Sequence, residues 1–149
     1  MNASNNSHNP QNYEILIQKA HLIAIEFMNK AYCPYSHFQV GAALIAESGL
    51  IIGGYNIENS SYGATVCAER TALWSALTQT SERKFWGIVI LTNNETPTPP
   101  CGLCRQTLIE FCDLSLKIFL GNKHSLKQFG TLGDFLPFPF DPKQLSTSS

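Results

Sequence analysis

Two short cysteine motifs lie far apart in this chain: Cys67-Ala68-Glu69 and Pro100-Cys101-Gly102-Leu103-Cys104. Three thiolates can hold one zinc ion and leave its fourth position open to water, which is typical of catalytic rather than structural sites. The fold must then bring both motifs to one point, and this requirement constrains the chain more than any other feature. Beside such a site, Glu69 is the candidate proton carrier.

The composition indicates one domain and a small ligand. The chain has 149 residues, of which 44% are apolar, enough to bury a single core. Only 14% are charged and the formal net charge is -1, so the basic surface that a nucleic-acid strand needs is missing. The low charge also favours a surface partly covered by other subunits. We expect a weakly charged small molecule as the ligand, and no nucleic-acid partner.

The sequence shows no sign of membrane insertion or secretion. No apolar run approaches the roughly 20 residues that span a bilayer, and residues 1–10 lack the basic and apolar regions of a signal peptide. We therefore expect a soluble, cytoplasmic protein without a membrane partner. The five cysteines are an odd number, which favours reduced thiols over disulfides. Cys33 and Cys112 are expected to be buried or half-buried thiols.

Hydrophobic periodicity and turn residues predict helices layered on a mixed sheet. We expect one domain over residues 13–142, with flexible tails at 1–12 and 143–149. Thr65 is the expected cap of the second helix, and Pro100 suits the start of the third. The expected helices are residues 13–31, 67–78 and 101–111 with a last turn at 131–136, and the expected strands are a hairpin within 39–55, then 86–92, 116–120 and 125–129.

The cysteines fall where helices are expected to begin. Helix N-termini carry free N–H groups and partial positive charge, which stabilise thiolates at Cys67 and Cys101. Cys101 and Cys104, three residues apart on a helix, would share one face. Arg70 and Arg105 each adjoin a proposed ligand, and we expect both to donate hydrogen bonds to sulfur and to offset the excess negative charge.

Other interpretations explain the motifs less completely. A Cys-x-x-Cys pair alone also suits a redox site, but a redox pair needs no Cys-x-Glu partner. A structural zinc site would need a fourth ligand, and Cys33, Cys112 and the four histidines show no recognisable ligand spacing. Glu69 by itself could simply be a carboxylate that is favourable at a helix start.

A Cys-x-Glu motif followed by Pro-Cys-x-x-Cys is the signature of zinc-dependent deaminases. The chain closely resembles the small, homotetrameric cytidine deaminases of nucleoside salvage, over nearly the whole domain. The resemblance rests on Ala31-Tyr32-Cys33-Pro34-Tyr35-Ser36-His37-Phe38, Val40-Gly41-Ala42-Ala43, Asn56-Ile57-Glu58-Asn59, Cys67-Ala68-Glu69-Arg70-Thr71-Ala72, Pro100-Cys101-Gly102-Leu103-Cys104-Arg105-Gln106 and Phe135-Leu136-Pro137. It implies a three-layer α/β/α fold with a mixed five-stranded sheet, and one Zn²⁺ per subunit on Cys67, Cys101 and Cys104.

The resemblance also implies an activity: hydrolysis of cytidine and 2′-deoxycytidine to uridine and 2′-deoxyuridine with release of ammonia. Glu69 would carry protons while water attacks C4 of the base. Asn56 and Glu58 would bind the ribose 3′-hydroxyl, and a two-residue spacing on a strand points both side chains to one side. Phe38 would contact the pyrimidine ring, and Ala68 would offer backbone contacts to the base.

Two further positions concern the neighbouring subunits. Tyr62 and Phe140 match positions that close the site across the interfaces of a homotetramer in this family. On the sequence alone, the aromatic tail could equally cover its own core. The chain departs from the family in its Pro-rich loop at residues 96–100, which should be stiff.

Two alternatives remain. One is a deaminase for a modified cytosine nucleoside, such as blasticidin S, although the intact Asn56-Ile57-Glu58-Asn59 motif favours ordinary cytidine. The other is a non-catalytic binding protein stabilised by zinc, which would have no use for Glu69.

Overall fold

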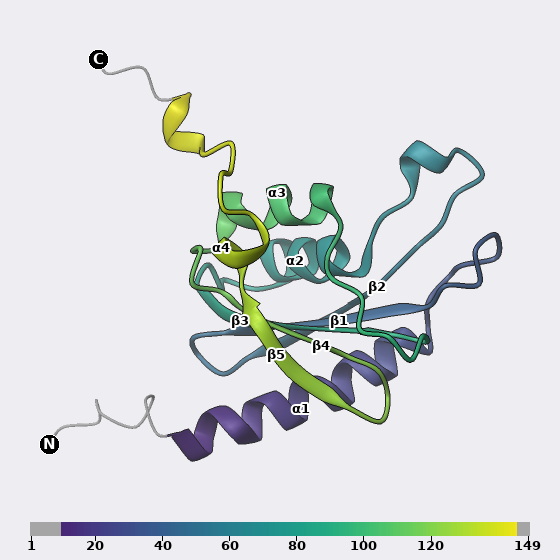
Figure 1. Ribbon diagram of the computed structural model, residues 1–149, viewed down its shortest axis with the longest axis horizontal. Coiled ribbons are helices and arrows are strands. Elements are labelled where there is room, and N and C mark those ends of the chain that lie inside the picture. The colour runs from purple at the N-terminus through teal and green to yellow at the C-terminus, as the bar shows by residue number, and fades with distance from the viewer. Residues whose placement is uncertain (1–9, 146–149) are drawn as a thin grey trace, which may run out of the picture.

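The structure, a computed structural model, describes residues 10–145. A five-stranded sheet of order β2-β1-β3-β4-β5 lies between helices on both faces (Figure 1). Only β3 and β4 are parallel, and the other neighbours are antiparallel. This confirms the predicted three-layer α/β/α fold with a mixed sheet. The elements are α1 (Pro10–Met28), β1 (Val40–Ala46), β2 (Ile51–Tyr55), α2 (Ala68–Gln79), β3 (Phe85–Thr92), α3 (Gly102–Phe111), β4 (Lys117–Gly121), β5 (Leu126–Thr131) and α4 (Leu132–Phe135), with 3₁₀ turns at Tyr62–Ala64 and Pro142–Gln144.

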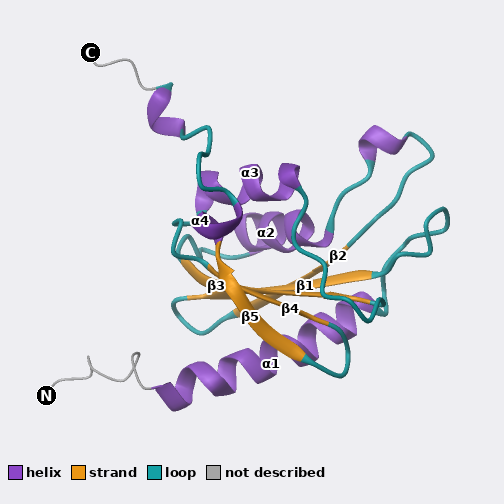
Figure 2. Ribbon diagram, viewed as in Figure 1, coloured by secondary structure: helices purple, strands orange, loops and turns teal. Residues whose placement is uncertain are grey.

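The core has two halves, one on each face of the sheet. All seven residues of β1 are buried, and their side chains alternate between the faces. Helices α2 and α3 cover one face of the sheet and α1 covers the other (Figure 2). Ala42 and Leu44 pack in the cluster with α2 and α3, whereas Ala43 and Ile45 pack in the cluster with α1. A strand covered on both faces has apolar residues at nearly every position, as residues 40–46 do. Each fully buried Leu or Ile contributes roughly 1.5–3 kcal/mol to stability.

The topology places the starts of α2 and α3 at the same end of the sheet. Strands β2 and β3 are both antiparallel to β1, so they run in the same direction. The chain leaves β2 toward α2 and leaves β3 toward α3, and both helices lie on one face. The two cysteine motifs therefore come together at the carboxyl ends of β2 and β3, where open α/β sheets commonly form their sites.

The termini differ from the prediction. Helix α1 begins at Pro10 and ends at Met28, so residues 10–12 are helical and are not part of a tail. Its end is fixed because Tyr32 leaves the helical path and donates a backbone hydrogen bond to Asn56. At the other end a turn at Pro142–Gln144 overlaps the start of the predicted tail at 143–149. Residues 1–9 and 146–149, the rest of the predicted tails, lie outside the described residues.

The predicted cap of the second helix is wrong. Val66 exchanges backbone hydrogen bonds with Ile57, which holds the chain extended up to that point. Thr65 uses its hydroxyl to accept the backbone N–H of Asn59 instead. Helix α2 starts later, with Cys67 as its N-cap residue.

Within residues 10–145, none of the helices combines the length and the apolar character needed to cross a bilayer.

Gly54 lets α2 lie directly on β2, so we expect Gly54→Ala to destabilise the protein by about 2 kcal/mol or more. A Cβ at this position would lie 2.3 Å from the backbone N of Ala72 and 2.6 Å from the carbonyl oxygen of Ala68, forcing the helix away. Gly63→Ala is the matched control, because a Cβ there meets nothing within 4 Å. Urea unfolding of both variants tests this, and equal stabilities would contradict it.

Candidate active site

A cavity of about 240 Å³ lies where the two cysteine motifs meet. It contains several residues singled out in the sequence, together with others that were not. Its lining residues are Ser36, Phe38, Val40, Asn56, Glu58, Thr65, Cys67, Glu69, Ile90, Thr92, Thr98, Pro99 and Cys101. Sulfur, amide and carboxylate groups therefore line the same cavity.

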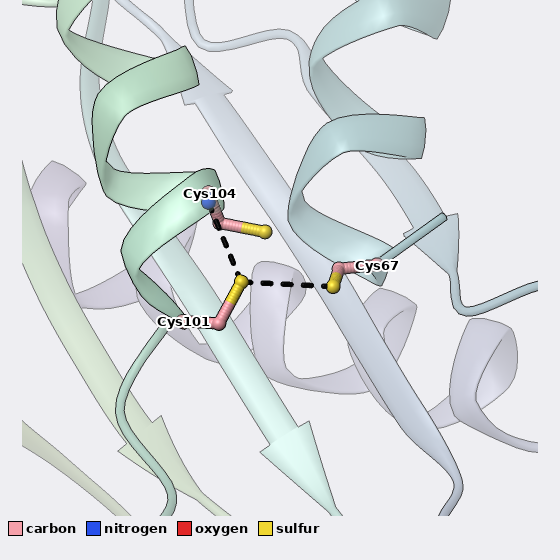
Figure 3. A group of neighbouring side chains, drawn as sticks. All are labelled: Cys67, Cys101 and Cys104. Atoms are coloured by element: carbon pink, nitrogen blue, oxygen red, sulfur yellow. Dashed lines mark hydrogen bonds between the residues drawn. The ribbon is translucent and has the colours of Figure 1, made fainter. Parts of the chain in front are cut away.

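The three predicted ligands form one group (Figure 3). The sulfur atoms of Cys67, Cys101 and Cys104 all lie within 4.8 Å of one another, and the first two are 3.8 Å apart. A tetrahedral zinc site with bonds near 2.3 Å requires sulfurs about 3.8 Å apart, so the spacing fits zinc. All three thiols are free of disulfides. Three thiolates leave one position of a tetrahedron open.

Local structure stabilises negative charge on these sulfurs. Cys67 is the N-cap of α2 and Cys101 is the N-cap of α3. The sulfur of Cys101 accepts a hydrogen bond from the backbone N–H of Cys104 at 3.4 Å. Hydrogen bonds from Cys104, Arg70 and Cys101 lower the pKa of Cys67 to about 5. The hydrogen bond with Cys67, together with burial, raises the pKa of Cys104. A metal ion that displaces the remaining protons would therefore find a group already partly ionised.

The two arginines differ in what they contact. The Arg70 guanidinium donates to the sulfur of Cys67 at 3.7 Å and to the carbonyl of Thr65 at 3.3 Å. Arg105 does not make the predicted sulfur contact, because it donates to the carbonyl oxygens of Pro100 and Phe135 at 2.7 and 3.0 Å. Arg105 thus ties Pro100, the first residue of the second motif, to the end of α4.

Glu69 lies in the first turn of α2, two residues after Cys67, and is only 4% exposed. Burial, as the main cause, raises the pKa of Glu69 to about 7. A carboxyl group with a pKa near the working pH can both accept and release a proton, which suits general acid and base catalysis. Its position on the cavity wall places this proton carrier beside the sulfur group.

Asn56 and Glu58 contribute an amide and a carboxylate to the cavity wall. Both follow the end of β2 rather than lying in it, yet both line the same cavity. The Asn56 side chain is buried and held by the backbone, donating to the carbonyl of Phe38 at 2.8 Å and accepting from the N–H of Val40 at 2.9 Å. Glu58 accepts hydrogen bonds from Tyr35 and Ser36. Each side chain therefore has a fixed orientation.

The remaining predicted residues are less uniform. Phe38 lines the cavity, whereas Ala68 is fully buried between two lining residues. As the first residue of α2, Ala68 has an N–H without an acceptor inside the helix, so its backbone is available to a ligand.

Tyr62 and Phe140 do not line the cavity. Tyr62 is 73% exposed and borders a neighbouring hollow that it shares with Tyr35 and Glu58. Phe140 is 57% exposed, and its carbonyl accepts a hydrogen bond from Gln106 on α3. The turn at Pro142–Gln144 stands clear of the sheet and its helices (Figure 1). Neither aromatic side chain closes the site of its own chain.

Several lining residues were missed in the sequence. Thr98 and Pro99 come from the Pro-rich loop, for which the sequence predicts stiffness and no part in a cavity. Ser36 lies within a motif that supports the resemblance, but nothing in the sequence assigns its side chain a role. Thr65 is predicted as a helix cap. All four lie within two residues of a motif or inside one, and proximity in sequence does not say which residues face a cavity.

Known proteins are similar to this chain in sequence and in fold. Residues 15–119 match a family model described as the cytidine and deoxycytidylate deaminase zinc-binding region. The chain is 44% identical over 123 residues to a cytidine deaminase of Halalkalibacterium halodurans, covering 83% of this chain and 92% of that protein. It is also 44% identical over 117 residues to the cytidine deaminase of Sporosarcina psychrophila, covering 78% and 85% of the two chains.

Solved structures agree with the sequence matches. A crystal structure of cytidine deaminase from Burkholderia pseudomallei has a TM-score of 0.77 at 40% identity, covering 83% of this chain and 98% of that one. The Mycobacterium tuberculosis cytidine deaminase has a TM-score of 0.72 at 33% identity, covering 83% and 96%. The family model covers most of the chain, the relatives have matching lengths, and the solved structures share the fold. The three-cysteine group agrees with a zinc-binding region. The chain belongs to the cytidine and deoxycytidylate deaminase family.

Proposed function

We propose that this protein catalyses the zinc-dependent hydrolytic deamination of cytidine and 2′-deoxycytidine in pyrimidine nucleoside salvage. The observation that carries the proposal is the cavity itself. Cys67 and Cys101 of the three-sulfur group line it together with the buried carboxyl group of Glu69. Asn56 and Glu58, a pair suited to binding a hydroxyl, line the same cavity. A nucleoside has both a reacting base and a sugar hydroxyl, so one cavity serves both. The identity to named cytidine deaminases supports this substrate class.

Glu69 performs the proton transfers. When bound by Cys67, Cys101 and Cys104, zinc supplies Lewis-acid activation of water near neutral pH. The Glu69 carboxylate takes one proton from the attacking water and delivers it to N3 of the cytosine ring, which makes C4 electrophilic. It then carries the second proton of that water to the exocyclic amino group, which leaves as ammonia. Water and cytidine thus become uridine and ammonia without any redox step.

Asn56 and Glu58 select the sugar. After its backbone contacts, the Asn56 amide keeps one N–H, and Oε1 of Glu58 keeps an acceptor position. A sugar hydroxyl both donates and accepts, so it matches this pair. A site built for a hydroxyl strongly rejects ligands without one, so free cytosine should be a poor substrate. Phe38 offers an aromatic face to the base, and the Ala68 N–H offers a backbone donor.

The assembled form is proposed to be a homotetramer with shared sites. Large apolar side chains are exposed at Trp74 on α2, at Leu103 and Phe111 on α3, and in the C-terminal segment, where Phe138 is 94% exposed. Exposed apolar side chains of this size suit an interface between subunits. Neither Tyr62 nor Phe140 lines the cavity of its own chain, which supports the proposal that both close the cavity of a neighbour. The five free cysteines suit a reducing compartment, and we propose the cytoplasm.

Two other functions are compatible with the metal group. A deaminase for a modified cytosine nucleoside would share Glu69 but would favour the modified substrate over cytidine. A non-catalytic zinc-binding protein would show no turnover of either. Following cytidine absorbance, with and without a chelator, separates these cases from the proposed one.

Glu69→Gln should keep the zinc and the fold but lower kcat by about 10³-fold or more, because the amide cannot carry protons. Glu110→Gln, on the exposed side of α3, is the matched control and should leave kcat unchanged. Steady-state assays together with zinc analysis and thermal unfolding test this. Near-normal turnover by a zinc-loaded Glu69→Gln protein would disprove the assignment.

Removing the metal should abolish turnover, and one equivalent of Zn²⁺ per subunit should restore it. Cys101→Ala should lose both bound zinc and activity, because two thiolates hold zinc far less well than three. Cys33→Ala, which alters a half-buried thiol outside the sulfur group, should keep both. Full activity in the metal-free enzyme, or zinc retained by Cys101→Ala, would contradict the ligand assignment.

Mixed oligomers should reveal a shared site. Phe140→Ala alone and Glu69→Gln alone should each be weakly active. Because a mixed tetramer combines Glu69 of one subunit with Phe140 of another, equal mixing should recover roughly a quarter of the wild-type rate. The assay is turnover after the two variants are unfolded and refolded together. Activity no higher than that of the separately refolded variants would place Phe140 outside its neighbour's site.

A further inference from the structure

Glu58 is held in place by one short segment of the chain. Its Oε2 accepts the backbone N–H groups of Tyr35 at 2.9 Å and of Ser36 at 3.2 Å. Its Oε1 accepts the hydroxyl of Ser36. Successive backbone N–H groups that point the same way form a concave anion site, and a carboxylate fits it well. The hydrogen bond from the Ser36 side chain is the main cause that lowers the pKa of Glu58.

The Ser36 hydroxyl has a second partner that links it to the base-contacting residue. It accepts the backbone N–H of Phe38 at 3.0 Å, a local bond that fixes the serine side chain. The carbonyl oxygen of Phe38 in turn accepts a hydrogen bond from the side-chain amide of Asn56 at 2.8 Å. One network therefore joins Glu58, Ser36, Phe38 and Asn56. It connects the carboxylate and the amide of the hydroxyl-binding pair through the residue that faces the base.

The backbone around Ser36 is built to hold this arrangement. The N–H of His37 donates to the carbonyl of Cys33 at 3.0 Å, closing a turn around Tyr35 and Ser36. His37 has a φ of 56°, a conformation that side-chain-bearing residues seldom adopt. The amide of Asn93, at the end of β3, bonds the carbonyl of His37 and the N–H of Gln39 at 3.0 and 3.1 Å. The turn is thus fixed to the sheet.

We propose that Ser36 is a positioning residue for sugar recognition. It directs Oε1 of Glu58 toward the sugar hydroxyl and sets its distance from the base held beside Phe38. The inference rests on the proposed nucleoside function and adds to it a residue that determines specificity. Its consequence is that Ser36 contributes only to substrates that carry the 3′-hydroxyl.

The decisive comparison uses 2′-deoxycytidine and 2′,3′-dideoxycytidine, which differ only in that hydroxyl. In full-length Ser36→Ala, KM for 2′-deoxycytidine should rise about 10-fold, the scale of a lost hydrogen bond to a charged group, while kcat changes little. KM for 2′,3′-dideoxycytidine should stay within about 2-fold of wild type, because the lost hydroxyl contact is absent in both enzymes. Ser36→Thr, which keeps the hydroxyl, should restore the wild-type preference.

The chain supplies a matched control at the β1–β2 turn. The Ser48 hydroxyl also bonds a glutamate, Glu82, at 2.6 Å and accepts the backbone N–H of Leu50 at 3.2 Å. Ser48→Ala therefore removes the same kind of contact outside the cavity and should leave both KM values unchanged. If Ser36→Ala does not fold, Ser36→Cys, nearly the same size with a weak donor, carries the same comparison.

The outcomes separate the inference from the proposed function. If wild type deaminates both nucleosides and Ser36→Ala affects them equally, or affects only kcat, the positioning role is wrong and the function stands. An unchanged KM for 2′-deoxycytidine would also overturn it. If the zinc-loaded wild type turns over neither nucleoside, the proposed function fails and the role of Ser36 fails with it. Loss confined to 2′-deoxycytidine supports both.

Discussion

The meeting of two helix N-termini governs this structure. Helices α2 and α3 start at the same end of the sheet because β2 and β3 run in the same direction, and each helix has a cysteine as its N-cap. Cys67 and Cys101 come within 3.8 Å there. Free N–H groups and the positive ends of the helix dipoles stabilise thiolates. The three sulfurs could hold a metal ion and leave one coordination position open. Glu69, in the first turn of α2, lies beside them.

The pKa values of two carboxyl groups in one cavity, Glu69 and Glu58, are shifted in opposite directions by their surroundings. Burial raises the pKa of Glu69 to about 7, so it can exchange protons near neutral pH. Hydrogen bonds from Ser36 and Tyr35 lower the pKa of Glu58, so it stays ionised and serves as a fixed acceptor. One is suited to chemistry and the other to recognition. The two side chains come from different elements: Glu69 lies in the first turn of α2, and Glu58 lies in the segment after β2.

Prediction from the sequence worked where a local pattern decides the outcome. The apolar run at residues 86–92 forms nearly all of the central strand β3, Phe85–Thr92, and the predicted cysteines form one sulfur group. It did not work where a distant partner competes with a local signal. Thr65 has the chemistry of a cap, but pairing of Val66 with Ile57 keeps the chain extended past it. Arg105 adjoins a cysteine in the sequence, yet its side chain donates a hydrogen bond to the carbonyl oxygen of Phe135.

The sequence by itself determined the candidate chemistry: three thiols that suit zinc, a carboxyl group that we propose moves a proton, and the family motif that surrounds them. These follow from residue type and spacing, which need no knowledge of distant contacts. Only the tertiary structure decided which oxygen of Glu58 is held by Ser36, that Thr98 and Pro99 wall the cavity, and that Phe140 lies away from its own site. Such relations join segments far apart in the chain, and the packing of strands and helices alone sets which of them meet.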